Sequence, residues 1–218
     1  FVLCASENSS YIIGHSHYNN MDLNKLYVLY SASSYGIDIP KTLVTNSTKE
    51  AEVFEKNNGE LIIKPISNCI SYFDKEQNIM FKMFTSAIDW NYFGGKVLFP
   101  TMFQEKLKKK TELRVFYFYG VFKSIRIYTQ SNINTSLDMR KYDYINPNRL
   151  TAVQIPEVLI NKLEQFMNYL GLTTASIDLV ETIDGKYILL DINPYGMVGH
   201  FDECDIDLSN MIYDYLIK

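Results

Sequence analysis

Two periodicities divide the chain into helices and strands. Apolar residues recur every three or four positions in segments that carry helix signals, such as Pro156 ahead of Gly171 and a Ser-Thr-Lys-Glu capping box that starts at Ser47. Short runs rich in β-branched and aromatic residues, bounded by Gly, Pro or Asp-Gly, are typical of strands. The predicted helices cover residues 22–35, 47–58, 156–170 and 208–217. The predicted strands cover residues 42–45, 61–64, 97–104, 112–119, 121–128, 175–182 and 186–192.

Residues 67–95 interrupt this regular pattern. They mix polar with aromatic residues and contain a Gly94-Gly95 break, so we predict a partly ordered loop or a hairpin there. Elsewhere helices and strands alternate without repeats or low-complexity linkers. With 218 residues, the chain can bury a core as one domain or as two tightly joined lobes. The pattern therefore favours an α+β fold.

The segment that follows the third predicted helix sets two carboxylates opposite each other. Asp-Gly is the strongest two-residue signal for a hairpin turn, so we predict Asp184 and Gly185 as the loop. Counting outward, Asp178 then falls opposite Asp191, and Asn193 shares their face. Three oxygen ligands on one face suit Mg²⁺ or Mn²⁺ carrying phosphates. The alternatives are that Asp191 caps a turn, or that one acid is protonated and hydrogen-bonded to the other.

Two lysines strengthen the phosphate interpretation. Lys25 lies near the start of the first predicted helix, and Lys64 ends the apolar strand Leu-Ile-Ile-Lys. An ammonium group at the end of a buried strand must reach a counter-charge, because burying it unpaired is unfavourable. The alternative is that both are surface lysines whose alkyl stems lie on the protein while the ammonium reaches water.

A further strand end precedes a basic run. The Gln-Glu pair at 104–105 offers backbone N–H and C=O groups for an adenine edge, and Glu112 is a candidate ribose ligand. Arg114 and Arg126 lie on the next hairpin, where bidentate donors suit phosphates. Charged residues are also common on half-exposed sheets. The lysine-rich run 106–110 is either a solvated face or a contact for an acidic peptide.

Composition adds mainly exclusions. The chain is 47% hydrophobic and 21% charged, which is ordinary for a globular protein. Its net charge of −4 gives no reason to expect nucleic-acid binding. Cys4, Cys69 and Cys204 lie far apart without a CxxC motif, so we expect neither a zinc site nor a disulfide framework, and a reduced, cytoplasmic setting is favoured. No apolar run is long enough to span a bilayer, and no signal peptide is visible.

Five segments, taken in chain order, resemble the ATP-grasp fold. They are LNKLYVLYSASSYGIDIPKTLVTNS, GELIIKPIS, FQEKLKKKTELRVFYFYG, ASIDLV and LLDINPYG. In particular they resemble the graspetide synthetases, which are microviridin-type peptide ligases, and most of all the maturases paired with a SPASM-type radical enzyme. The stretch SLDMRKYD is similar to the Asp-Trp-Arg motif of these ligases, with Met139 where Trp is usual. Gly196-Met197 stands where the family tends to have Gly-Gln.

The resemblance implies two α/β lobes with a nucleotide bound between antiparallel sheets. Residues 25–104 would form the small lobe, and residues 105–218 the large lobe with the metal site. Residues 1–24 would be the remnant of an N-terminal domain that is otherwise absent, and the chain opens on Phe1 instead of Met, so we expect a fragment of a longer protein.

The resemblance also assigns roles to single residues. Lys25 and Lys64 would bind the ATP phosphates, and Glu112 the ribose. The adenine would be held by Gln104, Glu105, Lys106 and Leu107. The magnesium ions would be ligated by Asp178, Asp191 and Asn193. The transferred phosphoryl group and the acyl phosphate would be stabilised by Arg114, Arg126 and Arg140.

The implied activity is an ATP-dependent, ADP-forming carboxylate ligase. It would join Asp or Glu side chains of a ribosomal precursor peptide to Ser/Thr hydroxyls or Lys amines and so form macrocycles. Its partners would be that peptide, with a leader segment for which residues 67–95 are the candidate surface, and a SPASM-type radical enzyme; a homodimer stays open. The alternatives are a ligase for small molecules or protein C-termini, of the glutathione-synthase or glutamate-ligase kind, and a non-catalytic ATP-binding module.

Overall fold

The computed structural model describes residues 23–66, 71–76, 78–82, 84–93, 98–141, 143–194 and 199–217. The chain divides into two compact units, each assembled from separate stretches of sequence. The larger unit comprises Phe1–Ile39, Lys109–Thr129 and Asn148–Lys218, and the smaller unit comprises Pro40–Lys108 and Gln130–Pro147. This division differs from the predicted lobes, because the first helix joins the larger unit and the segment at 130–147 joins the smaller one. Within the described ranges, no helix is long and apolar enough to cross a membrane.

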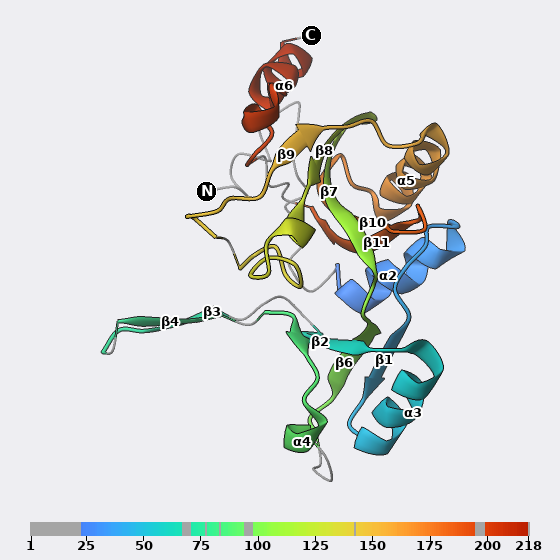
Figure 1. The fold of residues 1–218 in the computed structure, drawn as a ribbon. Coiled ribbons are helices and arrows are strands. Elements are labelled where there is room, and N and C mark those ends of the chain that lie inside the picture. The colour runs from blue at the N-terminus through green and yellow to red at the C-terminus, as the bar shows by residue number, and fades with distance from the viewer. Residues whose placement is uncertain are drawn as a thin grey trace. The chain divides into compact units, whose positions relative to one another are not determined.

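The larger unit is built on a five-stranded antiparallel sheet in the order β11-β10-β7-β8-β9 (Figure 1). Its strands are β7 (Lys109–Phe118), β8 (Val121–Ile127), β9 (Leu150–Ala152), β10 (Thr174–Thr182) and β11 (Tyr187–Asn193). Its helices are α2 (Lys25–Ser34), α5 (Glu157–Leu170) and α6 (Leu208–Leu216), with short 3-10 turns at Thr129–Ser131 and Asp202–Cys204. The two predicted hairpins and the three helices predicted in these regions are confirmed.

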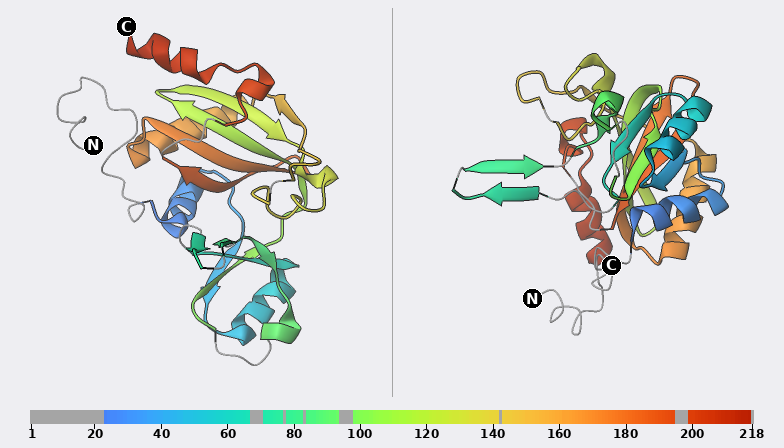
Figure 2. Two further views of the ribbon diagram at one scale, coloured as in Figure 1. Left: turned by 90° about the vertical axis from the view of Figure 1, so that its left-hand side faces the viewer. Right: turned by 90° about the horizontal axis from the view of Figure 1, so that it is seen from below.

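The two faces of this sheet are covered by different elements. Helices α2 and α5 pack on one face, where Leu163, Phe166, Ile177 and Leu179 form the centre of the main core. On the other face a second cluster gathers around Phe201 and the start of α6. Figure 2 shows α5 and α6 on opposite sides of the sheet. Because side chains alternate along a strand, each sheet residue belongs to one of these two faces, and this decides which site residues can meet.

The smaller unit contains a four-stranded antiparallel sheet in the order β1-β6-β2-β5. Its strands are β1 (Thr42–Thr45), β2 (Leu61–Lys64), β5 (Ser86–Ala87) and β6 (Thr101–Glu105), and its helices are α3 (Thr48–Asn58) and α4 (Trp90–Phe93). The strands β3 (Ser71–Asp74) and β4 (Ile79–Lys82) pair only with each other, as a separate ribbon (Figures 1 and 2). Within the described part of residues 67–95, the predicted hairpin is observed as the pairing of β3 with β4.

Helix α3 begins with the predicted capping box, but one of the two hydrogen bonds of the box runs through Thr45. The Ser47 hydroxyl accepts a hydrogen bond from the Glu50 N–H at 3.3 Å, as a capping box requires. The Glu50 carboxylate, however, accepts from the Thr45 hydroxyl at 2.5 Å, and the Ser47 N–H donates to that same hydroxyl oxygen at 3.0 Å. Thr45 thus relays the bond that the box would make directly, and it ties the end of β1 to the helix.

Candidate active site

The turn between β10 and β11 contains three residues, where the sequence predicted two. The Thr182 N–H donates to the Lys186 carbonyl at 2.9 Å, and the Gly185 N–H donates to the Thr182 carbonyl at 3.0 Å, so residues 183–185 form the loop. Gly185 has φ +81°, the left-handed conformation that ends a three-residue hairpin loop. The two-residue prediction was therefore wrong, and the strands leave the turn one residue out of the predicted register.

A β-bulge at Leu190 restores the predicted pairing further along. Next to the turn, Leu179 pairs with Leu189, but the register then shifts and Asp178 pairs with Asp191. Had the register near the turn continued, Leu190 would oppose Asp178 and Asp191 would point to the helix-covered face. The bulge re-aims the carboxylate, which is a common use of bulges beside functional sites. The predicted opposition of the two acids is confirmed, although the reasoning behind it missed two compensating irregularities.

Each acid of this pair holds one cation. Arg114 lies in register with Asp178 on the neighbouring strand, and its Nε donates to Asp178 Oδ1 at 3.0 Å. The Nζ of Lys25, at the start of α2, lies 3.0 Å from Asp191 Oδ2. Asn193, two residues beyond Asp191, shares the same face and is exposed. Four predicted site residues therefore lie on the face opposite α5: Arg114, Asp178, Asp191 and Asn193. Lys25 reaches Asp191 from the start of α2.

Glu112 lies on the same face, buried deeper. Its carboxylate receives hydrogen bonds from Lys109 Nζ at 2.9 Å and from the Thr129 hydroxyl at 3.1 Å. Burial raises the pKa of Glu112, although the positive charge and hydrogen bond of Lys109 oppose that shift. The role of Glu112 at the ribose stays a prediction.

Arg126 lies on the other face of the sheet. It is in register with Leu113, which belongs to the helix-covered core, and its Nη2 donates to Glu181 Oε2 at 2.6 Å. Burial opposes ionisation of Glu181, yet the hydrogen bond from Lys110 and the charge of Arg126 lower its pKa overall. The role of Arg126 at the phosphoryl group stays a prediction. Its observed partner, Glu181, was missed by sequence reasoning, although its odd spacing from Asp178 places it on the opposite face.

The residues predicted to hold adenine lie at the end of β6 in the smaller unit. Gln104 is almost fully buried, and its amide donates to the Thr42 hydroxyl at 2.9 Å. Glu105 Oε1 accepts from the Lys41 N–H at 2.9 Å. Lys106 pairs with an exposed glutamate, and Leu107 is half-buried. The Gln104 side chain is thus bonded within the sheet, so the predicted adenine contact at this position would have to come from the backbone.

Lys64 and Arg140 also belong to the smaller unit. Lys64 ends β2, in register with Met102 of β6. Arg140 is held by Asp138, which accepts from the Arg140 Nε at 2.8 Å and, through its other oxygen, from the Thr85 N–H at 2.8 Å. Burial opposes ionisation of Asp138, but the bonds from Arg140 and Thr85 hold its pKa well below the usual range. Asp138 is therefore the positioning group for Arg140, and the only signal for it in the sequence was the motif that both residues share.

We call the sheet face that carries Asp178 and Asp191 the acid face. Its oxygen ligands suit a hard cation such as Mg²⁺. Across the described ranges, no group of three or more His, Cys, Asp or Glu side chains comes together. The predicted set of two carboxylates and one amide oxygen, from Asp178, Asp191 and Asn193, is what Mg²⁺ uses when phosphate oxygens and water complete its shell. The two acids are partly exposed, which leaves room for that shell.

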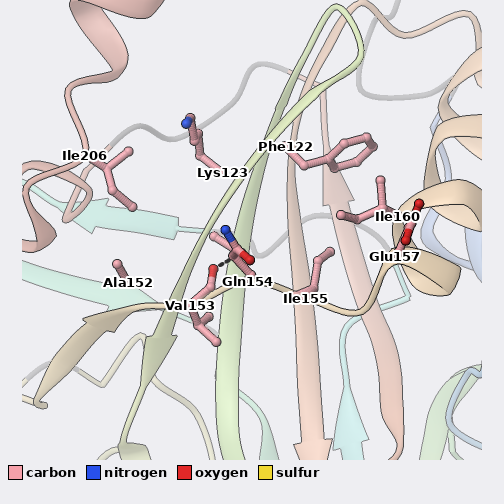
Figure 3. Close-up of a pocket in the computed structure, with 10 residues that line it drawn as sticks. Phe122, Lys123, Ala152, Val153, Gln154, Ile155, Glu157, Ile160 and Ile206 are labelled. Carbon is pink, nitrogen blue, oxygen red and sulfur yellow. Dashed lines mark hydrogen bonds between the residues drawn. The ribbon is translucent and has the colours of Figure 1, made fainter.

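A separate hollow of about 640 Å³ lies at the edge of the same sheet (Figure 3). It is bordered by β8, by the segment after β9 and by the first turn of α5, and the Ser124 hydroxyl donates to the Val153 carbonyl at 2.6 Å beside it. None of the site residues predicted from the sequence lines this hollow.

Solved structures share this architecture, although no family model and no curated protein matches the chain. A RiPP-associated ATP-grasp ligase from Chryseobacterium gregarium, in complex with ADP and a leader and core peptide, superposes with a TM-score of 0.77 at 22% identity, over 88% of this chain and 59% of that chain. The ATP-grasp ligase PsnB, complexed with a minimal precursor, Mg and ADP, gives a TM-score of 0.74 at 19% identity, over 99% and 64%. The macrocyclase MdnB from Microcystis aeruginosa gives 0.63 at 26% identity, over 89% and 59%.

These likenesses define the class of fold. The chain has the ATP-grasp fold, as the resemblance of its sequence implied, with helices packed on a five-stranded and a four-stranded antiparallel sheet. It spans 59% of the length of the Chryseobacterium ligase and of MdnB, and 64% of PsnB.

Proposed function

We propose that this chain is the nucleotide-binding core of an ATP-dependent, ADP-forming ligase that activates carboxylates as acyl phosphates. The observation that carries this is the acid face of the five-stranded sheet, where Asp178 and Asp191 oppose each other and each holds a cation, Arg114 or Lys25. In such a site the two carboxylates can bind metal ions, and the two cationic side chains can bind the negatively charged phosphates. Bound nucleotides in the solved ATP-grasp ligases support the same reading.

The proposed reaction has two steps. A substrate carboxylate oxygen attacks the γ-phosphorus of ATP, the bond to the bridging oxygen breaks, and ADP leaves with the electron pair. A hydroxyl or amine then attacks the acyl carbon, phosphate departs, and the nucleophile loses its proton. Positioning and charge neutralisation supply most of the catalysis in such transfers, so cationic side chains dominate over nucleophilic ones.

The residues of this chain divide that work. Lys25 and Lys64 bind phosphate oxygens, and Glu112 accepts from the ribose. Arg114 and Arg140 neutralise charge on the transferred phosphoryl group and on the acyl phosphate, with Arg126 retained as a weaker candidate because it faces the other side of the sheet. Magnesium, held by Asp178, Asp191 and Asn193, would screen the phosphate charge and orient the γ-phosphoryl group.

The substrate that we propose is a ribosomal precursor peptide whose Asp or Glu side chains are joined to Ser/Thr or Lys. Three ligases of the same fold are complexed with peptides of this kind: the Chryseobacterium enzyme with a leader and core peptide, PsnB with a minimal precursor, and MdnC with its precursor peptide. A small-molecule ligase is the second candidate, because the D-cycloserine synthetase DcsG shares the fold with a TM-score of 0.56 at 14% identity. A non-catalytic module is disfavoured, since the predicted lysines and metal ligands are all present.

We further propose that the β3–β4 ribbon and the residues after it bind the peptide's leader segment. Thr85, just beyond the ribbon, is fixed to Asp138, and the Lys141 Nζ lies 5.6 Å from the centre of the Phe84 ring. Phe81 and Phe84 are the aromatic residues of this stretch that we expect to anchor the leader, and the side chain of Phe81 lies outside the described residues. We also propose that the protein works with a SPASM-type radical enzyme, forms a homodimer and is located in the cytoplasm.

Two charge-removing variants on one hairpin test the proposed function. Asp191→Asn should abolish ATP-dependent ligation, because it removes charge from the site that handles the phosphates. Asp184→Asn is the matched control, since Asp184 lies in the exposed turn of the same hairpin and pairs only loosely with Lys186 at 3.4 Å. The substrate is a short precursor peptide rich in Thr and Asp/Glu, taken from any reading frame of that kind beside the gene for this chain. Undiminished ligation by Asp191→Asn, or equal loss in both variants, would contradict the site.

A further inference from the structure

Glu112 is bonded to its protein partners through one oxygen. Lys109 Nζ donates to Glu112 Oε1 at 2.9 Å, and the Thr129 hydroxyl donates to the same oxygen at 3.1 Å. From the part of the chain that the structure describes, no hydrogen bond reaches Oε2. The Glu112 side chain is only 7% exposed, and a buried carboxylate oxygen without a donor is unfavourable. One oxygen of Glu112 is therefore left for a donor that the protein does not supply.

A β-bulge places Lys109 on the same face as Glu112. In a regular strand, residues three positions apart point to opposite faces. At the start of β7, however, the register with β10 shifts, and Lys110 is an extra residue in the strand. Lys110 Nζ donates to one oxygen of Glu181 at 2.6 Å, and the Thr111 hydroxyl donates to the other at 3.3 Å. Lys110 and Thr111 thus share one face of the sheet. Lys109 is turned to the other face, which is the acid face.

The two neighbouring lysines differ in burial as well as in face. The side chain of Lys110 is 57% exposed, whereas that of Lys109 is only 11% exposed. A solvated basic run does not explain a lysine at this depth, because buried lysines are rare and need a partner. A buried ion pair is also a weak source of stability, since the loss of hydration of both charges offsets their attraction. The burial of Lys109 beside Glu112 therefore points to a role in the site.

The charges around Glu112 point the same way. Burial raises the pKa of Glu112, and the negative charge of Asp178 on β10 raises it further. The charge and hydrogen bond of Lys109 lower the pKa, as does the hydrogen bond from Thr129. Lys109 thus favours the ionised carboxylate, which is the stronger acceptor for a hydroxyl group.

We propose that Lys109 is a positioning residue for nucleotide binding, which holds Glu112 through Oε1 so that Oε2 accepts a hydrogen bond from a ribose hydroxyl. This inference rests on the proposed function, because it takes the nucleotide as the ligand of Glu112. Lys109 touches Glu112 and acts on the nucleotide through it. The lysine-rich run 106–110 is then divided by the bulge, with Lys109 serving the site and Lys110 outside it.

The binding of ATP and of 2′,3′-dideoxy-ATP, which lacks both ribose hydroxyls, tests the proposal. Calorimetric titrations in the presence of magnesium give the dissociation constant of each nucleotide, and the ratio of the two constants is the ribose preference. The wild type should bind ATP about tenfold tighter, since a hydrogen bond to a charged group contributes about that factor. Lys109→Met should lose most of this preference, and Lys109→Arg, which keeps the charge and the donors, should retain most of it.

The adjacent lysine and a double variant provide the controls. Lys110→Met removes the same charge from a lysine that also binds a buried glutamate, but on the other face, so it should keep the wild-type ribose preference. Lys109→Met combined with Glu112→Gln separates positioning from direct contact. The double variant should bind ATP as well as Glu112→Gln alone does. It leaves neither partner of the ion pair as an unpaired buried charge, so it can be measured even where Lys109→Met fails to fold.

The outcomes separate this inference from the proposed function. An unchanged ribose preference in Lys109→Met, or an equal loss of it in Lys110→Met, would overturn the positioning role. Equal weakening of both nucleotides by Lys109→Met would also overturn it, in favour of a direct phosphate contact. The same holds if the double variant binds ATP more weakly than Glu112→Gln does. A wild type that binds ATP without ribose preference would remove Glu112 from the ribose and this inference with it. A wild type that does not bind ATP would contradict the proposed function itself.

Discussion

The ion pair between Arg114 and Asp178 should be a measurable source of stability in the nucleotide-free protein. The guanidinium contacts the carboxylate at 3.0 Å and, through Nη2, at 3.4 Å, and the side chains are 11% and 28% exposed. Two unit charges about 4 Å apart attract by about 4 kcal/mol at the effective dielectric typical of such sites. Desolvation offsets much of this, so we expect a net coupling energy of about 1–2 kcal/mol.

A double-mutant cycle measures that coupling. Arg114→Met, Asp178→Asn and their combination are unfolded in urea, and the coupling energy is the departure from additivity. Each single variant should lose about 2 kcal/mol, because each leaves one largely buried group without its ion-pair partner, and the double variant should lose less than the sum. Lys186 and Asp184 form the matched control pair, at 3.4 Å with side chains 64% and 59% exposed. Its coupling should stay below about 0.5 kcal/mol. Equal coupling in the two cycles would refute the reasoning.

Two further predictions concern Glu112 and Lys64, the residues proposed to contact the ribose and the phosphates. Because burial raises the pKa of Glu112, folding takes up a proton between the ordinary glutamate pKa, about 4.3, and the raised value, so the stability of the wild type falls as the pH rises through that window. Glu112→Gln has no carboxyl group to titrate, so its stability should not fall in this window. Urea unfolding of both proteins from about pH 4 to about pH 8 should therefore show the free energy of unfolding of the variant rising relative to that of the wild type. A constant difference between the two free energies would contradict the raised pKa of Glu112. Lys64→Ala should weaken ATP binding far more than adenosine binding in calorimetric titrations, because its ammonium is proposed to face phosphate. Equal losses for the two ligands would place Lys64 away from the phosphates.

Local patterns predicted most of the secondary structure, because each element carries its own signals. Periodicity together with Pro and Gly placed α5, and the capping box placed α3 within a residue. The strand predicted from residue 97 begins only at Thr101 in the described structure, while residues 94–97 lie outside the described ranges. For residues 67–95 the sequence left a loop and a hairpin open. An isolated two-stranded ribbon has no core to impose a clear alternation.

Register and face were harder to predict than the elements themselves. The opposition of Asp178 and Asp191 was predicted correctly only because an extra loop residue and the bulge at Leu190 compensate each other. No local signal distinguishes an Asp-Gly loop of two residues from one of three. Arg126 lies on the opposite face from Asp178 for a related reason. Its face is decided by the strand register that pairs it with Leu113, and a motif match takes no account of register.

Long-range contacts were the part that sequence could not supply. Asp138 reaches Thr85 across more than fifty residues, and only the folded unit shows that this acid orients Arg140. The division into units is another case. The first helix packs against β11 through contacts that span most of the chain, whereas the predicted lobes followed sequence order.

The formation of an acyl phosphate is the central claim, and heavy-oxygen transfer tests it most directly. A precursor peptide of the proposed substrate class, rich in Thr and Asp/Glu, is prepared with heavy oxygen in its Asp and Glu side-chain carboxylates and is incubated with the enzyme, magnesium and ATP. Mass spectrometry then examines the peptide and the released phosphate together. We predict that each ester or amide formed removes the mass of one labelled water from the peptide and delivers one heavy oxygen to phosphate. Cyclised peptide accompanied by unlabelled phosphate would contradict the account.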